Sequence, residues 1–253
     1  EGEHAFRVLC LDRATGAILW ERDAHVGVPK VKRHPKSTHA NSTPACDAEN
    51  VVAFFGSEGL YCYDREGELV WKKDLGVLDA GAPGLPQYQW GFASSPVIHG
   101  DRVIVQCDVQ GQSFLAMFDL ADGREVWRAE RDEDPTWCTP TVYPGLADGE
   151  YAQVIANGYK HAGGYDLATG AELWKLVGGG DVPVPTPVVA DGLIYLTSAH
   201  GRDRPIRAIH VDAEGLLEAD PEACEYVAWS HPRRGLYMQT PIAYRGRVYA
   251  RGD

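Results

Sequence analysis

Short apolar runs alternate with turn residues along this chain, and one phrase built in this way recurs. It reads YDLATGAELW at residues 165–174 and LDRATGAILW at residues 11–20. Looser copies lie at residues 63–71, 118–127 and 211–229, and the last reaches its tryptophan only after an acidic insertion. Copies at intervals of roughly 50 residues indicate an array of identical supersecondary units.

Every copy of this phrase has an aspartate in a turn and a tryptophan at the end of the following apolar run. The aspartates are Asp12, Asp64, Asp119, Asp166 and Asp212, and the tryptophans are Trp20, Trp71, Trp127, Trp174 and Trp229. Aspartate side chains hydrogen-bond the backbone of turns, so we expect the five aspartates to hold the turn before the last strand of each unit. We expect each repeated tryptophan to pack into the adjacent unit.

A second recurring phrase, with a hydroxyl residue before a proline, opens each unit. The fullest copy is TPVVADGLIY at residues 186–195. It reads as a short extended run, an Asp191-Gly192 hairpin turn and a second strand rich in β-branched and aromatic residues. Residues 206–211 give a third strand, and the segment that ends in tryptophan gives the fourth. Four short antiparallel strands per unit are typical of a β-propeller blade.

The pattern therefore predicts one all-β domain over residues 1–253, with almost no helix. Complete blades are predicted at about residues 36–78, 88–131, 135–177 and 181–233, and partial blades at 1–26 and 236–253. About five blades' worth of strands is present. Two alternatives fit these ends: a five-bladed ring in which the last two strands join the first two in one shared blade, or a piece of a larger propeller.

Charge and composition exclude several classes of function. Lys and Arg total 24 against 36 Asp and Glu, which gives a net charge of −12 and argues against a nucleic-acid partner. The sequence shows no apolar stretch long enough to span a membrane and no signal peptide. The six cysteines lack the spacing of a zinc site, so no metal site is expected.

Two sets of loops at one end of a propeller are the natural place for a ligand or partner, because loops on a rigid scaffold carry function. They are the loops that lead into the first strand of each blade and the loops between the second and third strands. The candidate residues on this channel-mouth face are His39, Asn41, Trp90, Trp137, Lys160, His161, His200, Arg202, Arg204, Tyr237 and Gln239.

Each part of this face has two interpretations. Trp90 and Trp137 lie outside the repeated tryptophan positions, and they either stack on a flat ring or peptide or plug the mouth by packing on their neighbours. The basic residues at 160–161 and 200–204 either attract an anionic ligand or an acidic partner, or are solvated and paired locally. No nucleophile elbow, metal-ligand set or phosphate loop accompanies them, so no catalytic residue is assigned.

The paired phrases at residues 165–174 and 186–195 resemble the pyrroloquinoline-quinone-like β-propeller repeat. Quinoprotein alcohol dehydrogenases and outer-membrane assembly factor B share this repeat. The resemblance covers essentially the whole chain. It implies that the ring has eight blades, of which this chain is a piece, and that the protein is extracytoplasmic, either periplasmic or secreted.

Two functions follow from this resemblance. The favoured hypothesis is a non-catalytic binding or assembly scaffold that holds a protein partner, or a small anionic or aromatic ligand, at the channel mouth. The alternative is a quinone-dependent dehydrogenase of small alcohols or sugars. The resemblance implies adjacent cysteines, calcium-binding carboxylates and a catalytic aspartate for such an enzyme, and this sequence has no Cys-Cys pair and no carboxylate that we can assign to the calcium or base position. No cofactor is therefore expected, and quinone with calcium remains the alternative.

Overall fold

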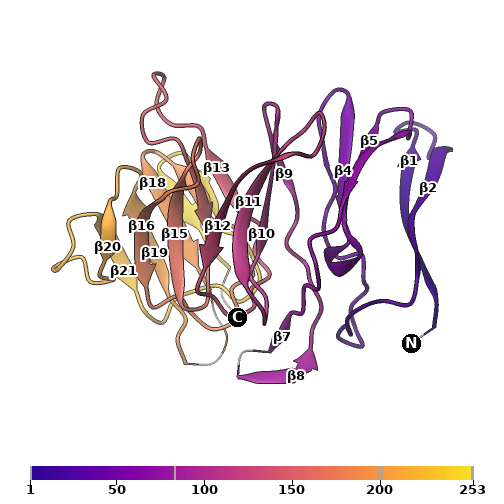
Figure 1. The fold of residues 1–253 in the computed structure, drawn as a ribbon. Coiled ribbons are helices and arrows are strands. Elements are labelled where there is room, and N and C mark those ends of the chain that lie inside the picture. The colour runs from indigo at the N-terminus through magenta and orange to yellow at the C-terminus, as the bar shows by residue number, and fades with distance from the viewer. Residues whose placement is uncertain (1, 83, 199, 201, 252–253) are drawn as a thin grey trace.

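A computed structural model describes residues 2–82, 84–198, 200 and 202–251. The chain forms successive antiparallel sheets that stand side by side (Figure 1). The innermost strands of neighbouring sheets contact one another in chain order, from β3 (Ala45–Cys46) through β9 (Val97–His99), β13 (Thr141–Tyr143) and β17 (Val188–Ala190) to β22 (Ile242–Tyr244). This is the arrangement of a partial β-propeller, and it confirms the all-β fold class.

Four of the sheets have the four antiparallel strands expected of a blade. Blade 1 contains β3, β4 (Asn50–Phe54), β5 (Leu60–Asp64) and β6 (Leu69–Lys73), and blade 2 contains β9, β10 (Arg102–Cys107), β11 (Ser113–Asp119) and β12 (Glu125–Arg131). Blade 3 contains β13, β14 (Gln153–Ala156), β15 (His161–Asp166) and β16 (Glu172–Val177), and blade 4 contains β17, β18 (Leu193–Thr197), β19 (Ile206–His210) and β21 (Val227–His231). A two-stranded sheet stands at each end: the N-terminal sheet of β1 (His4–Leu11) and β2 (Ile18–Gly27), and the C-terminal hairpin of β22 and β23 (Arg247–Tyr249).

The structure adds elements that the repeat pattern did not predict. A 3₁₀ turn, η1 (Gly56–Glu58), follows β4, and β7 (Gly81–Ala82) and β8 (Leu85–Gln89) form a hairpin between blades 1 and 2. The insertion in the fifth repeat contains β20 (Gly215–Leu217), which pairs in parallel with β16. Blade 3 thereby gains an outer strand contributed by the next repeat.

Three of the five repeated tryptophans contact the next sheet along the chain, whereas the Trp229 ring lies beside Tyr195 and His231 of its own blade. The indole Nε1 of Trp71 donates to the Leu120 carbonyl of blade 2 at 2.8 Å, and the ring covers Gly123 in the same turn. Trp20 and Trp127 make the corresponding contacts with the next sheet along the chain. Trp174 differs, because its Nε1 donates to Gln153 in its own blade while its ring joins the apolar core between blades 3 and 4.

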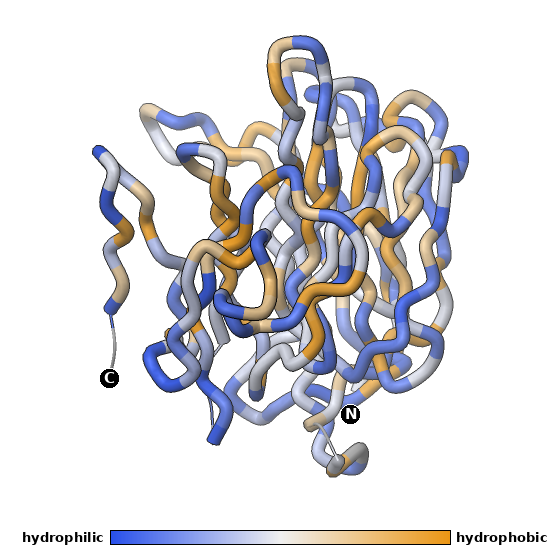
Figure 2. Tube along the Cα trace, turned by 90° about the vertical axis from the view of Figure 1, so that its left-hand side faces the viewer, coloured by the Kyte–Doolittle hydropathy of each residue, from blue (hydrophilic) through white to orange (hydrophobic). Residues whose placement is uncertain are grey.

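Four of the five repeated aspartates accept backbone hydrogen bonds in their turns, whereas Asp212 accepts none among the described residues. Asp12 accepts hydrogen bonds from the Thr15 N–H and hydroxyl, and Asp166 accepts the same pair from Thr169. At the Asp191-Gly192 turn both residues have positive φ, 52° and 77°, as a two-residue hairpin of this twist requires. Figure 2 shows hydrophobic segments running through the molecule and hydrophilic segments in many of the connecting loops.

Within the described residues, the N-terminal sheet and the C-terminal hairpin do not pair with each other. The shared blade of the five-bladed alternative is therefore not formed in this structure. Residues 1, 252 and 253 of the two predicted partial blades lie outside the described residues.

Candidate ligand-binding face

The two predicted loop sets do meet at one end of the molecule, the end that carries the β7–β8 hairpin in Figure 1. Residues from one set contact residues from the other. Gln89 Nε2 donates to Gln110 Oε1, and the His200 and Tyr237 rings lie 5.1 Å apart. The antiparallel order of strands in each blade explains this, because the loop into strand one and the loop after strand two emerge at the same edge.

Trp90 and Trp137 form an aromatic pair at this face. Their ring centroids are 5.1 Å apart, and the Trp137 Nε1 donates to the Gly91 carbonyl at 2.8 Å. Trp137 is buried in a cluster with Ala80 and Val182, and Trp90 is partly buried against that cluster. Of the two interpretations offered by the sequence, these contacts match the packed plug.

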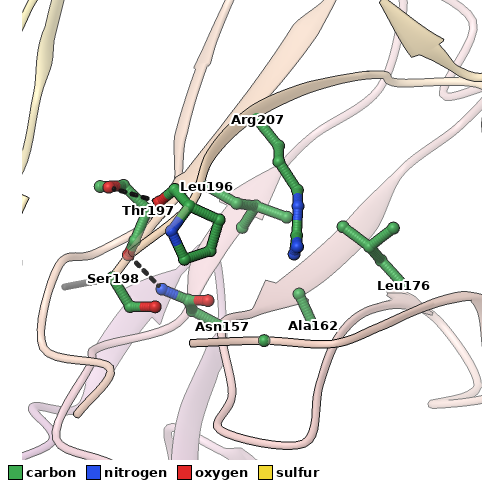
Figure 3. Close-up of a pocket in the computed structure, with 9 residues that line it drawn as sticks. Asn157, Ala162, Leu176, Leu196, Thr197, Ser198 and Arg207 are labelled. Carbon is green, nitrogen blue, oxygen red and sulfur yellow. Dashed lines mark hydrogen bonds between the residues drawn. The ribbon is translucent and has the colours of Figure 1, made fainter. Parts of the chain in front are cut away.

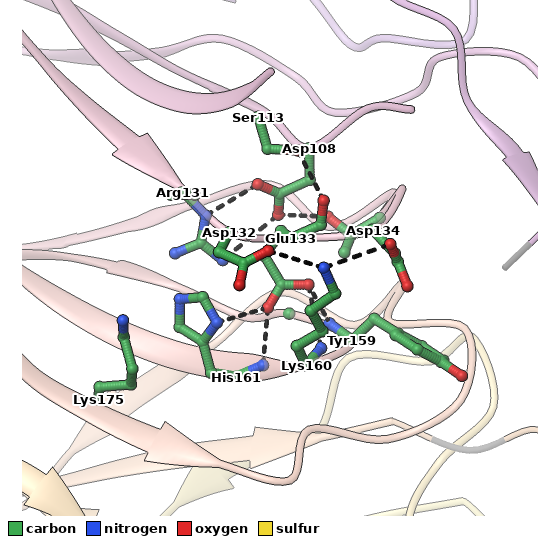
Figure 4. Close-up of polar contacts among 12 residues, drawn as sticks. Asp108, Ser113, Arg131, Asp132, Glu133, Asp134, Tyr159, Lys160, His161 and Lys175 are labelled. Atoms are coloured by element: carbon green, nitrogen blue, oxygen red, sulfur yellow. Dashed lines mark hydrogen bonds and ion pairs between the residues drawn. The ribbon is translucent and has the colours of Figure 1, made fainter. Parts of the chain in front are cut away.

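Glu133 organises the loop beneath the face (Figure 4). Its carboxylate accepts hydrogen bonds from the backbone N–H groups of Tyr159, Lys160 and His161, and from His161 Nδ1 at 2.9 Å. Burial alone would raise the pKa of Glu133, but the His161 hydrogen bond and the Arg131 charge outweigh it and hold that pKa below its usual value. His161, which the sequence placed on the exposed face, is therefore buried beneath it.

A buried ion pair lies behind the Glu133 cluster. The Arg131 Nε donates to Asp108 Oδ1 at 2.8 Å, and both side chains are fully buried. Gln106 and Thr136 donate to the other Asp108 oxygen, and the Arg131 guanidinium also donates to the Tyr165 hydroxyl. The pair has hydrogen-bond partners on both sides, as a buried ion pair must to offset its desolvation. Asp108 is therefore committed to Arg131 and does not pair with the exposed loop cations.

The exposed cations of the face fall into two groups. Lys160 Nζ is paired with Asp132 at 2.8 Å and with Asp134 at 3.5 Å, so its charge is locally neutralised. The second group, here called the basic ridge, consists of exposed arginines near the rim of blade 4: Arg202, Arg204, Arg233 and Arg234. A parallel β-bridge places Arg204 beside Arg233. None of these four has a carboxylate within ion-pair distance among the described residues.

The remaining predicted residues are spread around the mouth. The His39 ring lies 5.6 Å from His4 and 6.0 Å from Phe6, so it belongs to the N-terminal sheet. Asn41 accepts from the Thr38 N–H and donates to the Phe92 carbonyl, which ties its loop to blade 2. The Gln239 side chain accepts from the Met238 N–H.

Sequence reasoning missed Glu133, Arg131, Arg207 and the second half of the basic ridge. The repeat register gave no signal for Arg207, because by strand pairing His210, and not Asp212, takes the place of Asp166 in blade 4. Within the described ranges, no cluster of three or more His, Cys, Asp or Glu side chains is arranged to hold a metal ion. In those same ranges no helix has the length and apolar character to cross a membrane.

Comparison with known proteins places this geometry in context. A family model described as outer membrane protein assembly factor BamB matches residues 4–252. A search of curated proteins gives no match. Among solved structures, BamB from Moraxella catarrhalis is similar at 18% identity and a TM-score of 0.60, over 96% of this chain and 63% of that protein.

Two redox enzymes share the fold at lower identity. A europium-containing methanol dehydrogenase matches at 12% identity and a TM-score of 0.57, over 91% of this chain and 48% of the enzyme. The quinohemoprotein alcohol dehydrogenase ADHIIG from Pseudomonas putida HK5 matches at 12% identity and a TM-score of 0.51, over 82% and 37% of the two chains. This chain thus spans less than two thirds of the length of each of these structures.

Proposed function

This chain belongs to the family of outer membrane protein assembly factor BamB, and from that premise we propose that it is an extracytoplasmic, non-catalytic propeller that binds a protein partner through its channel-mouth face. The basic ridge carries this proposal. Arg202, Arg204, Arg233 and Arg234 gather exposed positive charge on a protein whose net charge is −12. Such a local reversal of sign attracts an acidic partner.

The rest of the face suits binding better than chemistry. The Glu133 and Asp108 carboxylates, which a catalytic reading would need, are occupied by backbone N–H groups and by Arg131. Tyr237 and the exposed Met238 stand beside the ridge and add apolar contact area. Aromatic and methionine side chains next to arginine are typical of protein interfaces.

Charge reversal tests the proposal. We expect the double variant Arg204→Glu, Arg233→Glu to reduce the amount of folded outer membrane protein in cells of the source organism, scored by heat-modifiable migration on gels. The control is Arg245→Glu, Arg247→Glu, which reverses two exposed arginines in the C-terminal hairpin turn at the opposite end of the sheets. Equal effects of the two variants, at matched melting temperature, would exclude the ridge as the binding surface.

We propose in addition that the protein works without a quinone. The Trp90 and Trp137 rings already pack on each other and on Val182, which supports a plug rather than a stacking platform. A thermal-shift titration with pyrroloquinoline quinone, with and without calcium, tests this, because a ligand of the folded state must raise the melting temperature. A saturable rise that requires calcium contradicts the proposal; an unchanged melting temperature supports it.

A further inference from the structure

The position that Glu133 occupies between blades 2 and 3 has a different residue at the next blade interface. Between blades 2 and 3, the space at the channel-mouth edge is filled by the carboxylate of Glu133, as Figure 4 shows. This side chain is fully buried and accepts from backbone N–H groups and from His161. The protein therefore already contains one carboxylate held in a pocket between two blades.

At the next interface, between blades 3 and 4, the equivalent carboxylate is missing. Gly180 follows Trp174 by the same interval as Glu133 follows Trp127. A Cβ built on Gly180 would point at Ser198 Oγ and Pro205, which line the space at this interface. By strand pairing, Pro205 takes the place of His161, and Arg207, a permanent cation two residues further along, lines this space.

Among the residues that the structure describes, Arg207 has no anionic partner in this space. One guanidinium nitrogen donates to the Gly178 carbonyl, but the Nε is buried and has no hydrogen-bond partner among the described residues. None of the carboxylates in those residues comes within ion-pair distance of it, although Asp203 is close enough to favour the charge. Burial lowers the pKa of Arg207, which reports the cost of holding this cation out of water.

The guanidinium points into a cavity of suitable size (Figure 3). The inner cavity measures about 10 Å³ and is lined by Asn157, Ala162, Leu176, Leu196, Ser198 and Arg207 among others. That volume is about enough for one water-sized group, such as a carboxylate oxygen. It adjoins an outer pocket of about 440 Å³, with which it shares Gly179, Pro205 and Arg207.

Charges around the outer pocket select among anions. Lys160 lines it but is already paired with two aspartates. Asp181 and Asp203 also line it, and the Asp181 carboxylate accepts the Arg202 N–H at 3.2 Å. Two aspartates at the rim oppose a doubly charged phosphate more strongly than a single carboxylate, and a carboxylate matches a guanidinium in geometry.

We infer that the pocket between blades 3 and 4 binds the side-chain carboxylate of an acidic residue from a partner protein, which fills the space that Glu133 fills at the preceding interface. That the carboxylate belongs to a protein partner rests on the function proposed above. The carboxylate chemistry rests only on Arg207, Gly180 and the cavity.

The test uses a small probe rather than the unknown partner. N-acetyl-glutamic acid amide carries the side chain of interest without other charges, and N-acetyl-glutamine amide is its neutral isostere. We expect the glutamyl amide to bind with millimolar affinity, seen as saturable shifts of the Arg207 Nε–Hε and Gly178–Gly180 amide resonances, while the glutaminyl amide shifts them at least about tenfold more weakly. Equal binding of the two probes to the wild-type protein would overturn the inference.

Two variants and two further probes complete the design. Arg207→Gln should abolish saturation, whereas Arg7→Gln should leave it unchanged, because Arg7 lies in β1, far from this pocket in the sequence, and is exposed and paired with Asp23. Acetate binding as tight as that of the glutamyl amide, or tighter binding of inorganic phosphate, would overturn the assignment to an acidic side chain. These measurements need no partner protein. A negative result for the basic-ridge variants therefore does not affect the carboxylate inference, and a negative result with the glutamyl probe does not affect the proposed role of the basic ridge.

Discussion

At the scale of single residues, the charge on Glu133 holds the loop at residues 158–161 in place. Its folded-state pKa is depressed, so the stability that it contributes is present above its unfolded pKa of about 4.3 and is lost as the pH falls through the lower folded value. We expect Glu133→Gln to remove about 3 kcal/mol at neutral pH, because it leaves several buried N–H groups short of an acceptor.

Chemical unfolding followed by tryptophan fluorescence, from about pH 7 down to about pH 3, measures this effect. The difference in unfolding free energy between wild type and Glu133→Gln should shrink on acidification. The exposed neighbour Glu130 supplies the control, since Glu130→Gln should change little at any pH. A difference that persists unchanged at the acid end would mean that Glu133 acts through packing rather than through its charge.

Burial also decides the reactivity of individual cysteines. It raises the pKa of the Cys62 thiol to about 12 and that of the Cys138 thiol to about 12, so almost no thiolate forms at neutral pH. Cys46 is exposed. At about pH 8 iodoacetamide should therefore label Cys46 in the native protein and spare Cys62 and Cys138, as peptide mass spectrometry can show. Labelling of all three at one rate would mean that the interior opens on the time scale of the reaction.

At the scale of elements, the contact between a tryptophan and the next blade's turn is the unit of assembly. A Cβ at Gly123 would lie 2.7 Å from the Trp71 ring, and φ there is +70°. We expect Gly123→Ala to cost roughly 2–4 kcal/mol, the sum of backbone strain and a displaced ring. Gly100→Ala is the matched control, because φ is +55° but nothing lies within 4 Å of its Cβ.

Thermal or chemical unfolding compares the two variants. Gly100→Ala reports strain alone, which is of order 1 kcal/mol, so the difference between them isolates the inter-blade contact. Equal destabilisation would show that the Trp71 ring can move aside without loss of stability. The contact of the repeated tryptophan would then not be what holds neighbouring blades together.

Sequence reasoning reached most of the elements because each repeat carries its own local signals. The Asp12 and Asp166 turns, the Asp191-Gly192 hairpin and the tryptophan contacts all follow from residues within one unit and its neighbour. The β7–β8 hairpin and β20 were missed, because they lie in insertions that break the repeat. Trp174 also departs from the pattern, because its Nε1 donates to Gln153 of its own blade and not to a backbone carbonyl of the next sheet.

The candidate face was less predictable than the fold. Which loops share an edge follows from strand order, and the structure brings those loops together. The burial of each side chain does not follow from strand order, because it depends on hydrogen bonds and ion pairs between residues of neighbouring blades. His161 is buried because Glu133, from the preceding blade, reaches its loop, and Arg207 is left without a carboxylate because Gly180 has no side chain. Neither relation is visible within a single repeat.

At the scale of the whole molecule, stability should vary from sheet to sheet. A blade in the middle of the array packs on both faces, as the fully buried Ile104 and Leu115 of blade 2 show. The terminal sheets pack on one face only, which leaves Leu19 62% exposed in the N-terminal sheet and Ile242 66% exposed in the C-terminal hairpin. In a repeat architecture stability is close to a sum over units and interfaces, so a sheet with one interface opens more easily than a sheet with two.

Native-state hydrogen exchange resolves this gradient. We expect amides of β1–β2 and β22–β23 to exchange through local openings that cost a few kcal/mol less than those of β10 and β11, whose protection should approach the free energy of global unfolding. Amide protection should fall most sharply at the two terminal sheets, which lack a second interface. A partner that covers either terminal sheet should raise the protection of that sheet. Uniform protection from the first strand to the last would mean that the array unfolds as one cooperative unit, with coupling between blades strong enough to override the missing interfaces.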